Sequence, residues 1–330
     1  MDVGEYPGRM MDAVPKQFAR VVWTAFAAVS LCAFSSGIPA ASGSDTPRAR
    51  SGGKVPLRIS VEDKDGIKIA GSDVRDAASS ATSAVLAFDR AYRAGDRIVI
   101  RGPQRIAVRL DKSMPECLLF LADSSLGEFD YEVPSGRSEQ ETGSAYAPDG
   151  FAGKFHRVTV RALDRNERTG YRNLALNPCD VLRPEEGPAS VFPHSSTNSY
   201  SRNLFDFAAR NAIDGMAQNG HHGVWPYQSW GPGLRGDLWW KLDFGRLVEV
   251  DNIRLMVRAD YPHDSYWNSA VVEFSDGSLL PIGMSSSAEF QAFDFSKRKI
   301  TWFRITKLVA ENPAKWCGFV EVEAWGHDLK

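Results

Sequence analysis

Two segments in the second half of the 330-residue chain mix aromatic side chains with charged and amide groups. They cover residues 219–230 (NGHHGVWPYQSW) and 258–268 (RADYPHDSYWN). An aromatic face packs on the apolar side of a sugar ring, and polar groups on loops hydrogen-bond its hydroxyls. We expect a sugar site in which Trp225, Tyr227, Tyr261 and Trp267 stack, while His222, Gln228, Arg258, His263, Asp264 and Asn268 bind hydroxyls. Packing within the loop is the open alternative for Trp225 and for each histidine.

Other chemistry in these segments lacks its required context. Residues 231–236 (GPGLRG) fit a dinucleotide fingerprint, but they precede a strand-like segment, whereas the fingerprint needs a helix there. The pair His221-His222 lacks the spaced partners of a zinc site. A glycosidase needs two carboxyls facing across one cleft, and Asp260, Asp264 and Glu273 are the acids close to the expected site. We therefore expect binding without bond breaking, and keep a polysaccharide-degrading enzyme as an alternative.

The overall charge argues against a nucleic-acid partner. The chain has 39 Lys and Arg against 41 Asp and Glu, giving a formal net charge of −2. A nucleic-acid-binding protein normally concentrates a basic surplus on one face. No nucleic acid is therefore expected as a partner.

The first 41 residues have the pattern of a secretory signal peptide. Lys16 and Arg20 precede an apolar run at 21–34, which gives way to small residues and a proline. That order predicts export to a periplasmic or extracellular location, and the run is too short to span a bilayer comfortably. Residues 42–54 are rich in Gly, Ser and charged residues, and are expected to be a flexible linker.

Residues 55–168 predict a β-rich domain with one helix. Apolar and polar residues alternate at 57–61, 97–100, 105–110, 117–121 and 157–162, which is the period of half-buried strands. Between them, residues 72–93 are Ala-rich without Gly or Pro, and their apolar positions recur at helical spacing. A helix is expected there.

Residues 171–330 repeat the strand pattern more strongly. Segments at 239–244, 250–258, 270–274, 302–308 and 319–325 are separated by Gly- and Asp-containing turns. Many short strands with little helix are typical of an antiparallel β-sandwich. The sequence therefore predicts an all-β protein in which a smaller β-rich domain precedes a sandwich.

Several motifs of this second region resemble the discoidin, or coagulation factor V/VIII C-type, domain, a galactose-binding-like jelly roll that includes fucolectins and carbohydrate-binding modules. The motifs are NLA at 173–175, NAIDG at 211–215, WWKLDFG at 239–245, a strand ending in Arg258, and VEVEAWG at 320–326. The resemblance covers about 155 residues. It implies an exported lectin-like protein that binds a glycan or polysaccharide without catalysis.

The resemblance also implies a calcium site and a disulfide. In such lectins the NAIDG loop binds Ca²⁺ together with a glutamate of the last strand, which here gives Asn211 and Met216 through their carbonyls and Asp214 and Glu321 through their side chains. Capping of the turn is the alternative role of Asp214. Because the two ends of the sandwich adjoin in the family, Cys179 and Cys317 are expected to form a disulfide, with three buried thiols as the alternative.

Discoidin domains also recognise proteins and lipid headgroups, so a protein-binding adhesion module at the cell surface is a further alternative. Membrane insertion is not expected, because the two loop segments lack a projecting run of apolar residues. Arg258 matches a sugar-binding arginine of the fucose lectins. Their second arginine has no counterpart in this chain, because Trp267 and Asn268 occupy that part of the sequence.

Overall fold

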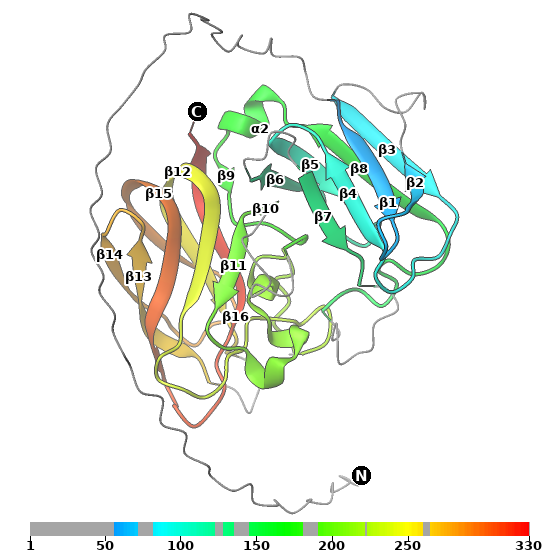
Figure 1. Cartoon of the computed structure of the whole chain (residues 1–330). Helices are drawn as coiled ribbons and strands as arrows, with labels where there is room; N and C mark the ends of the chain where they lie inside the picture. The colour runs from blue at the N-terminus through cyan, green and yellow to red at the C-terminus, as the bar shows by residue number, and fades with distance from the viewer. Residues whose placement is uncertain are drawn as a thin grey trace, which may run out of the picture. The chain divides into compact units, whose positions relative to one another are not determined.

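The computed structural model of the chain describes residues 56–71, 82–122, 128–134, 145–180, 191–221, 223–259 and 265–329 (Figure 1). Throughout this part of the chain, the strands pair in antiparallel fashion in three sheets. The expected all-β, sandwich-type architecture is confirmed. The signal peptide and linker expected at residues 1–54 lie outside the described residues.

Two sheets are built mainly from residues 58–162. The first has the order β2-β1-β4-β7 and consists of β1 (Arg58–Glu62), β2 (Lys68–Gly71), β4 (Arg97–Arg101) and β7 (Glu128–Glu132). The second has the order β10-β6-β5-β8-β3 and consists of β3 (Ser83–Phe88), β5 (Arg105–Arg109), β6 (Cys117–Leu121), β8 (His156–Ala162) and β10 (Val191–Phe192). All five strand segments expected in this region are present.

The prediction of a helix at 72–93 is wrong for the residues of this segment that form a strand in the structure. Residues 72–81 lie outside the described part, and residues 83–88 form β3, which pairs with β8. Ala84 and Leu86 are buried while their neighbours are more exposed, so the burial follows the period of two of a strand. The observed α-helix of this region is α2 (Arg165–Thr169), where Asp164 and Glu167 form a capping box.

The third sheet contains seven strands and is formed by residues 172–328. Its order is β14-β13-β15-β12-β16-β9, with β11 beside β12. The strands are β9 (Arg172–Asn173), β11 (His194–Thr197), β12 (Trp240–Val257), β13 (Trp267–Phe274), β14 (Leu279–Gly283), β15 (Gln291–Ala310) and β16 (Phe319–Asp328). Short 3₁₀ turns at Ser201–Asn203, Phe205–Phe207 and Ala209–Ala212 connect β11 toward β12.

Strand β12 joins two segments that the sequence predicts as separate strands. Its first residues pair with β11 and its later residues with β16, and β15 follows it along both parts. The pairing with β15 shifts register between Asp243 and Val248. Gly245 lies in this bend with φ of 65°, and a Cβ there would stand 2.2 Å from the Phe192 ring. Both the positive φ and the close contact require glycine.

The sandwich core is aromatic and aliphatic. Trp230, Trp240, Phe244, Phe303 and Phe319 are fully buried within it. The Trp240 indole also donates to the Ala209 carbonyl over 3.1 Å, which satisfies its polar edge. Truncating such a side chain to Ala typically costs about 3–5 kcal/mol. These residues therefore fix the frame that carries the surrounding loops.

The chain crosses between the sheets after β9. Strand β10 pairs with β6 although β10 lies beyond residue 171. Residues 52–330 form a single compact unit. The division into domains at 168–171 stays a prediction. Among the described residues, no helix is both long enough and apolar enough to cross a bilayer.

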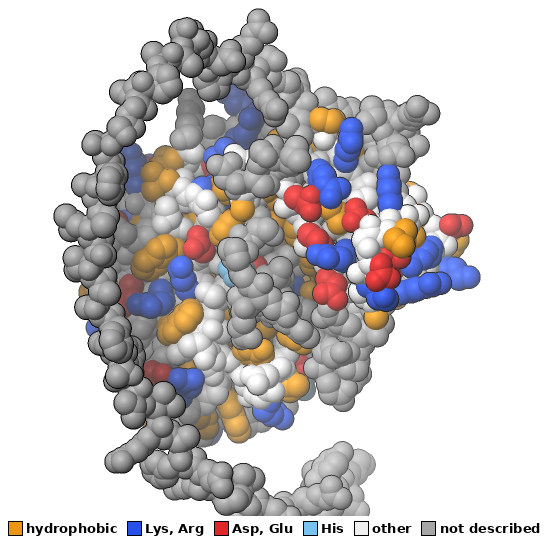
Figure 2. Space-filling model, viewed as in Figure 1, with side chains coloured by type: hydrophobic (Ala, Val, Ile, Leu, Met, Phe, Trp, Pro, Cys, Tyr) orange, Lys and Arg blue, Asp and Glu red, His pale blue; other side chains and the backbone are white. Residues whose placement is uncertain are grey.

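Charges of both signs alternate on the four-stranded sheet. Arg97 pairs with Asp130, and Arg101 pairs with Glu128 and Glu62. Figure 2 shows this interleaving of blue and red side chains on the face over β1, β4 and β7. Exposed pairs of this kind contribute little stability, and they leave no concentrated basic surface on that face.

The cysteines are arranged differently from the expected Cys179–Cys317 disulfide. The Cys179 Sγ lies 3.6 Å from the Cys117 Sγ on β6, and both residues belong to the core of the first two sheets. Cys317 belongs to the core of the sandwich. The crossing of the chain after β9 carries Cys179 away from the sandwich and toward β6, which accounts for the difference.

This proximity predicts the product of oxidation. Diamide added to the folded protein should join Cys117 to Cys179, because their sulfurs lie 3.6 Å apart in the folded protein. The reaction should be slow, since burial raises the pKa of the Cys117 thiol and the thiolate is the reactive form. Closing this 62-residue separation should stabilise the protein by roughly 4 kcal/mol on a chain-entropy estimate.

Peptide mapping by mass spectrometry gives the measurement. Cys317→Ser should leave the cross-link unchanged, whereas Cys179→Ser should abolish it. A cross-link between Cys179 and Cys317 in the folded wild-type chain would contradict the observed arrangement.

Candidate functional site

Three loops meet at one end of the sandwich. Backbone hydrogen bonds join Arg258 N to Gly318 O over 3.0 Å, Ser265 N to Trp316 O over 2.7 Å and Trp230 N to Phe319 O over 2.9 Å. The loops before β12, after β12 and before β16 are therefore tied to one another. This brings the two segments singled out by the sequence to the same end of the fold.

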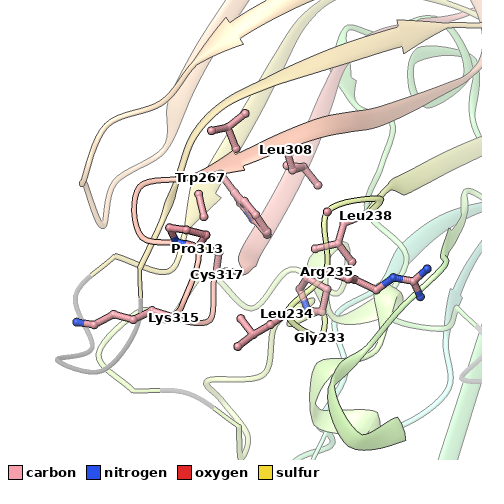
Figure 3. Close-up of a pocket in the computed structure, with 13 residues that line it drawn as sticks. Gly233, Leu234, Arg235, Leu238, Trp267, Leu308, Pro313, Lys315 and Cys317 are labelled. Carbon is pink, nitrogen blue, oxygen red and sulfur yellow. The ribbon is translucent and has the colours of Figure 1, made fainter.

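A cavity of about 440 Å³ lies between two of these loops. Figure 3 shows Gly233, Leu234 and Leu238 on one side and Trp267, Leu308, Pro313 and Cys317 on the other. Lys315 and Arg235 also line it, and their side chains extend outward to opposite sides of the view. An apolar hollow of this size with a few polar groups at its rim is typical of a small-ligand site.

Large apolar side chains are exposed around this cavity. Trp316 lies between two lining residues and is 45% exposed, while Leu234 and Val309 are each 51% exposed. A second backbone bond, from Glu311 N to Tyr266 O, holds the loop that carries Trp316. The exposed indole is therefore presented on a restrained loop. Sequence reasoning missed Trp316; the available signal was an aromatic residue beside Lys315 in the turn before the last strand.

Of the expected stacking residues, Trp267 does reach the cavity. It is 5% exposed, its ring stacks on Trp230 with centroids 6.4 Å apart, and it forms part of the lining. Trp225 and Tyr227 are half-buried, and Tyr227 lies against the His221 ring. Asn268 is exposed. The remaining expected residues His222, Tyr261, His263 and Asp264 lie outside the described residues.

Gln228 points into the interior of the protein, not toward the expected sugar site. It is 1% exposed, and its Nε2 donates to Asp214 Oδ2 over 2.8 Å. Its role is therefore in the interior, beside a buried carboxylate. This placement was not predictable from the sequence, because the residue type of an amide in a polar loop does not show whether its side chain points inward or outward.

Arg258 is also buried, with 4% exposure. Its Nη1 donates to Ser229 Oγ over 3.2 Å, and its guanidinium lies 5.9 Å from the Phe207 ring centre. A Cβ at Gly231 or Gly318 would come within 3.2 Å of this side chain, so both glycines leave room for it. In this structure Arg258 braces the loops, which differs from the expected direct contact with sugar.

Asp214 and Glu321 form a buried pair of carboxyls. They are 4% and 3% exposed, and Gly215 N, in a tight turn with φ of 83°, donates to Glu321 Oε1 over 3.3 Å. Burial raises the pKa of Asp214 to about 6, against the opposing effects of Arg210 and Gln228. Burial and then the Asp214 charge raise the pKa of Glu321 well above its usual value.

A cation at this pair of carboxyls would need oxygen atoms that are available as ligands. Glu321 Oε2 and Gln228 Oε1 are buried and accept no hydrogen bond from any residue of the described chain. Met216 N donates to Asp214 Oδ1 over 2.9 Å, which keeps the loop carbonyls beside the carboxylate. Asn211 is fully buried, and its Nδ2 donates to Phe205 O. Unsatisfied oxygen atoms of this kind fit a hard cation such as Ca²⁺.

No second carboxylate cluster strengthens this site. Within the described ranges, His, Cys, Asp and Glu side chains form no group of three or more that could hold a metal ion. A calcium ion would therefore depend on carbonyl oxygens for much of its coordination.

Asp180, His194 and Ser195 lie together near the start of β11. His194 Nδ1 lies 2.7 Å from Asp180 Oδ1, while Ser195 Oγ donates to Asp180 Oδ2 over 2.7 Å. In a catalytic triad the serine hydroxyl faces the histidine, which takes its proton. Here the aspartate holds both groups, so this set is a buried structural network. Glu273, one of the acids near the expected site, is paired with Arg304.

Searches for related sequences found no matching family model and no matching curated protein. Solved structures similar to this chain include chitosan-binding module 1 of a chitosanase/glucanase from Paenibacillus sp. IK-5, with 18% identity, covering 47% of this chain and 99% of that chain at a TM-score of 0.34. A fucose-binding module of Streptococcus pneumoniae has 18% identity, covering 47% of this chain and 98% of that chain at a TM-score of 0.34.

A third structure is the family 32 carbohydrate-binding module of C. perfringens NanJ in complex with galactose. It has 14% identity, covering 40% of this chain and 91% of that chain at a TM-score of 0.32. All three are carbohydrate-binding modules, a group that the sequence motifs of this chain also resemble. Each match covers less than half of this chain.

The Asp180–His194 pair predicts a pH dependence of stability. Burial lowers the pKa of His194, but the Asp180 charge and hydrogen bond outweigh it, and the net pKa is raised. The charged pair therefore stabilises the fold below the ordinary histidine pKa of about 6.5, and this stabilisation is lost as pH rises through the folded-state pKa. His194→Asn should accordingly cost more stability in acid than in base, measured by denaturant unfolding across this range.

His156 supplies a control of opposite sign. It is buried, and burial lowers its pKa. His156 should therefore make the wild-type fold less stable as pH falls below about 6.5. His156→Asn should remove this part of the pH dependence. Equal pH dependence in the wild type and the His194 variant would contradict the assigned network.

Proposed function

We propose that the sandwich binds a carbohydrate at the end where Trp267 and Trp316 lie, without catalysis. The observation that carries this proposal is the cavity of about 440 Å³ with Trp267 in its lining, together with the exposed Trp316, which lies in sequence between the lining residues Lys315 and Cys317. A sugar ring presents an apolar face that an indole covers, and Lys315 and Arg235 offer donors for hydroxyl or carbonyl oxygens at the rim. Chitosan, fucose and galactose, named for the neighbours above, belong to this ligand class.

The second candidate function is adhesion to another surface protein. Leu234 and Val309 line the same cavity and are exposed, and exposed apolar groups of this kind are typical of protein contacts. The export expected from the N-terminal sequence fits either function. A glycan array probed with the chain from residue 42 onward distinguishes them: saturable binding to a coherent set of sugars supports the first, and a blank array supports the second.

Substitution of the exposed indole tests the glycan site. Trp316→Ala should weaken glycan affinity by about fivefold, because the stacking contribution of one aromatic ring is on the order of 1 kcal/mol. The folded core should be retained, since Trp316 is half exposed. Isothermal titration with the best array ligand provides the measurement.

Phe155→Ala gives a matched control, because Phe155 is an aromatic residue that is 82% exposed just before β8. It should leave the affinity unchanged. Unchanged glycan affinity in Trp316→Ala would remove the indole from the site and weigh against the proposed location.

We further propose that Ca²⁺ binds between the Asn211–Met216 turn and β16. Asp214 and Glu321 would supply carboxylate oxygens, and the Asn211 and Met216 carbonyls would supply neutral ones. The orphaned Glu321 Oε2 supports this assignment. The bound ion would hold the turn against the last strand, so its role in glycan binding is structural support.

Calcium should therefore raise the thermal midpoint of the apo protein saturably, and a chelator should reverse the shift. Glu321→Gln should abolish the response, because it removes one of two acidic ligands. Glu323→Gln is the matched control: it lies two residues along β16 and its carboxylate contacts Arg254 and Trp325. A calcium response that survives in Glu321→Gln would place the ion elsewhere.

A further inference from the structure

A second cavity of about 450 Å³ lies where α2, the start of β5 and the end of β16 come together. It is lined by Arg105, Arg165, Arg168, Thr169, Asp328 and Leu329. Asp328 is the sole acid among these lining residues. Basic side chains thus outnumber acidic ones by three to one around a hollow large enough for a small ligand.

The interior behind this cavity carries further positive charge. Arg246 contacts Asp328 over 2.6 Å and Arg172 contacts it over 3.0 Å, while Arg105 Nε stands 3.9 Å away. Three guanidinium groups therefore share one carboxylate that is 3% exposed. Arg165 and Arg168 add two more charges at the lining.

Nearby acids do not neutralise this surplus. Glu167 lies on α2, but its carboxylate accepts from Arg161, over 2.7 Å at Oε2. Asp164 caps the same helix through the Glu167 N–H. Both carboxylates are thus committed to other partners in the described part of the chain.

The positive charge is also poorly solvated. The Arg246 side chain is 7% exposed, and Arg246 and Arg105 both lie over the Phe120 ring, at 5.2 and 5.4 Å. Burial lowers the pKa of Arg246 to about 10; Asp328 opposes this effect, whereas the Arg172 and Arg105 charges add to it. Arg105 Nε is buried and makes no hydrogen bond within the described residues. Asp328 offsets only one of the three positive charges that contact it, so an added anion would offset part of the remainder.

We propose that this cavity is an anion-binding site for a sulfate- or phosphate-type oxyanion, held chiefly by Arg105 and Arg168. A tetrahedral oxyanion offers acceptors in several directions, which suits guanidinium groups that approach from β5 and α2. The anion comes either as a free ion or as an ester group on a larger molecule such as a sulfated polysaccharide. This inference is independent of the glycan site, which lies around Trp267 and Trp316.

The first experiment uses the whole chain and inorganic ions. Sodium sulfate and sodium phosphate should each raise the thermal midpoint saturably, beyond the effect of sodium chloride at equal ionic strength. Arg105→Gln and the more exposed Arg168→Gln should each weaken the apparent affinity at least about tenfold. Arg109→Gln is the matched control, because Arg109 is exposed at the other end of β5.

The second experiment separates the two sources. Titration with a heparin oligosaccharide and with an uncharged polysaccharide is compared in the wild type, Arg168→Gln and Trp316→Ala. A sulfated ligand held here should lose affinity in Arg168→Gln and keep it in Trp316→Ala. Saturable binding of inorganic ions without heparin binding assigns a free ion. A midpoint that rises no more in sulfate and phosphate than in chloride, or an equal response in both arginine variants and wild type, overturns the proposal.

Discussion

The antiparallel pairing of β12 with β15 is the interaction on which the sandwich depends. It continues from Trp240 to Leu255 through two changes of register. Because side chains alternate between faces, a slip of one residue would move Trp240 and Leu242 out of the core and expose both. Trp267 begins β13, which pairs with β15, and the loop that carries Trp316 leads into β16, which pairs with β12. The relative positions of the two tryptophans therefore depend on the same register.

Strands were predictable from this sequence because alternation is a local signal. The segments at 105–110 and 117–121 were located nearly to the residue, whereas 83–88 was assigned to a helix because Val85 and Phe88 also match a helical period. The path of the chain after β9 was not predictable, since pairing of β10 with β6 depends on contacts distant in sequence. That path also decided which cysteines become neighbours.

The location of the candidate site was predictable from the sequence, but the residues that line it were less so. Composition located the two loops, but burial distinguished Trp267 in the cavity from Gln228 and Arg258 in the interior. The type of a residue does not show which way its side chain points. Long polar side chains bury their ends only where a partner such as Asp214 or Ser229 is available. Trp316 was overlooked because a single aromatic in a short turn has no periodic pattern to mark it.

The crossing of the chain between β9 and β10 has a consequence for dividing the protein. A fragment beginning at 171 would carry Val191 and Cys179 without the β6 partners that bury them, and a fragment ending at 168 would leave β6 as an open sheet edge. Unprotected edges recruit other strands, and exposed apolar groups favour association. Each half, expressed alone, would thus face a solubility problem that the intact chain avoids.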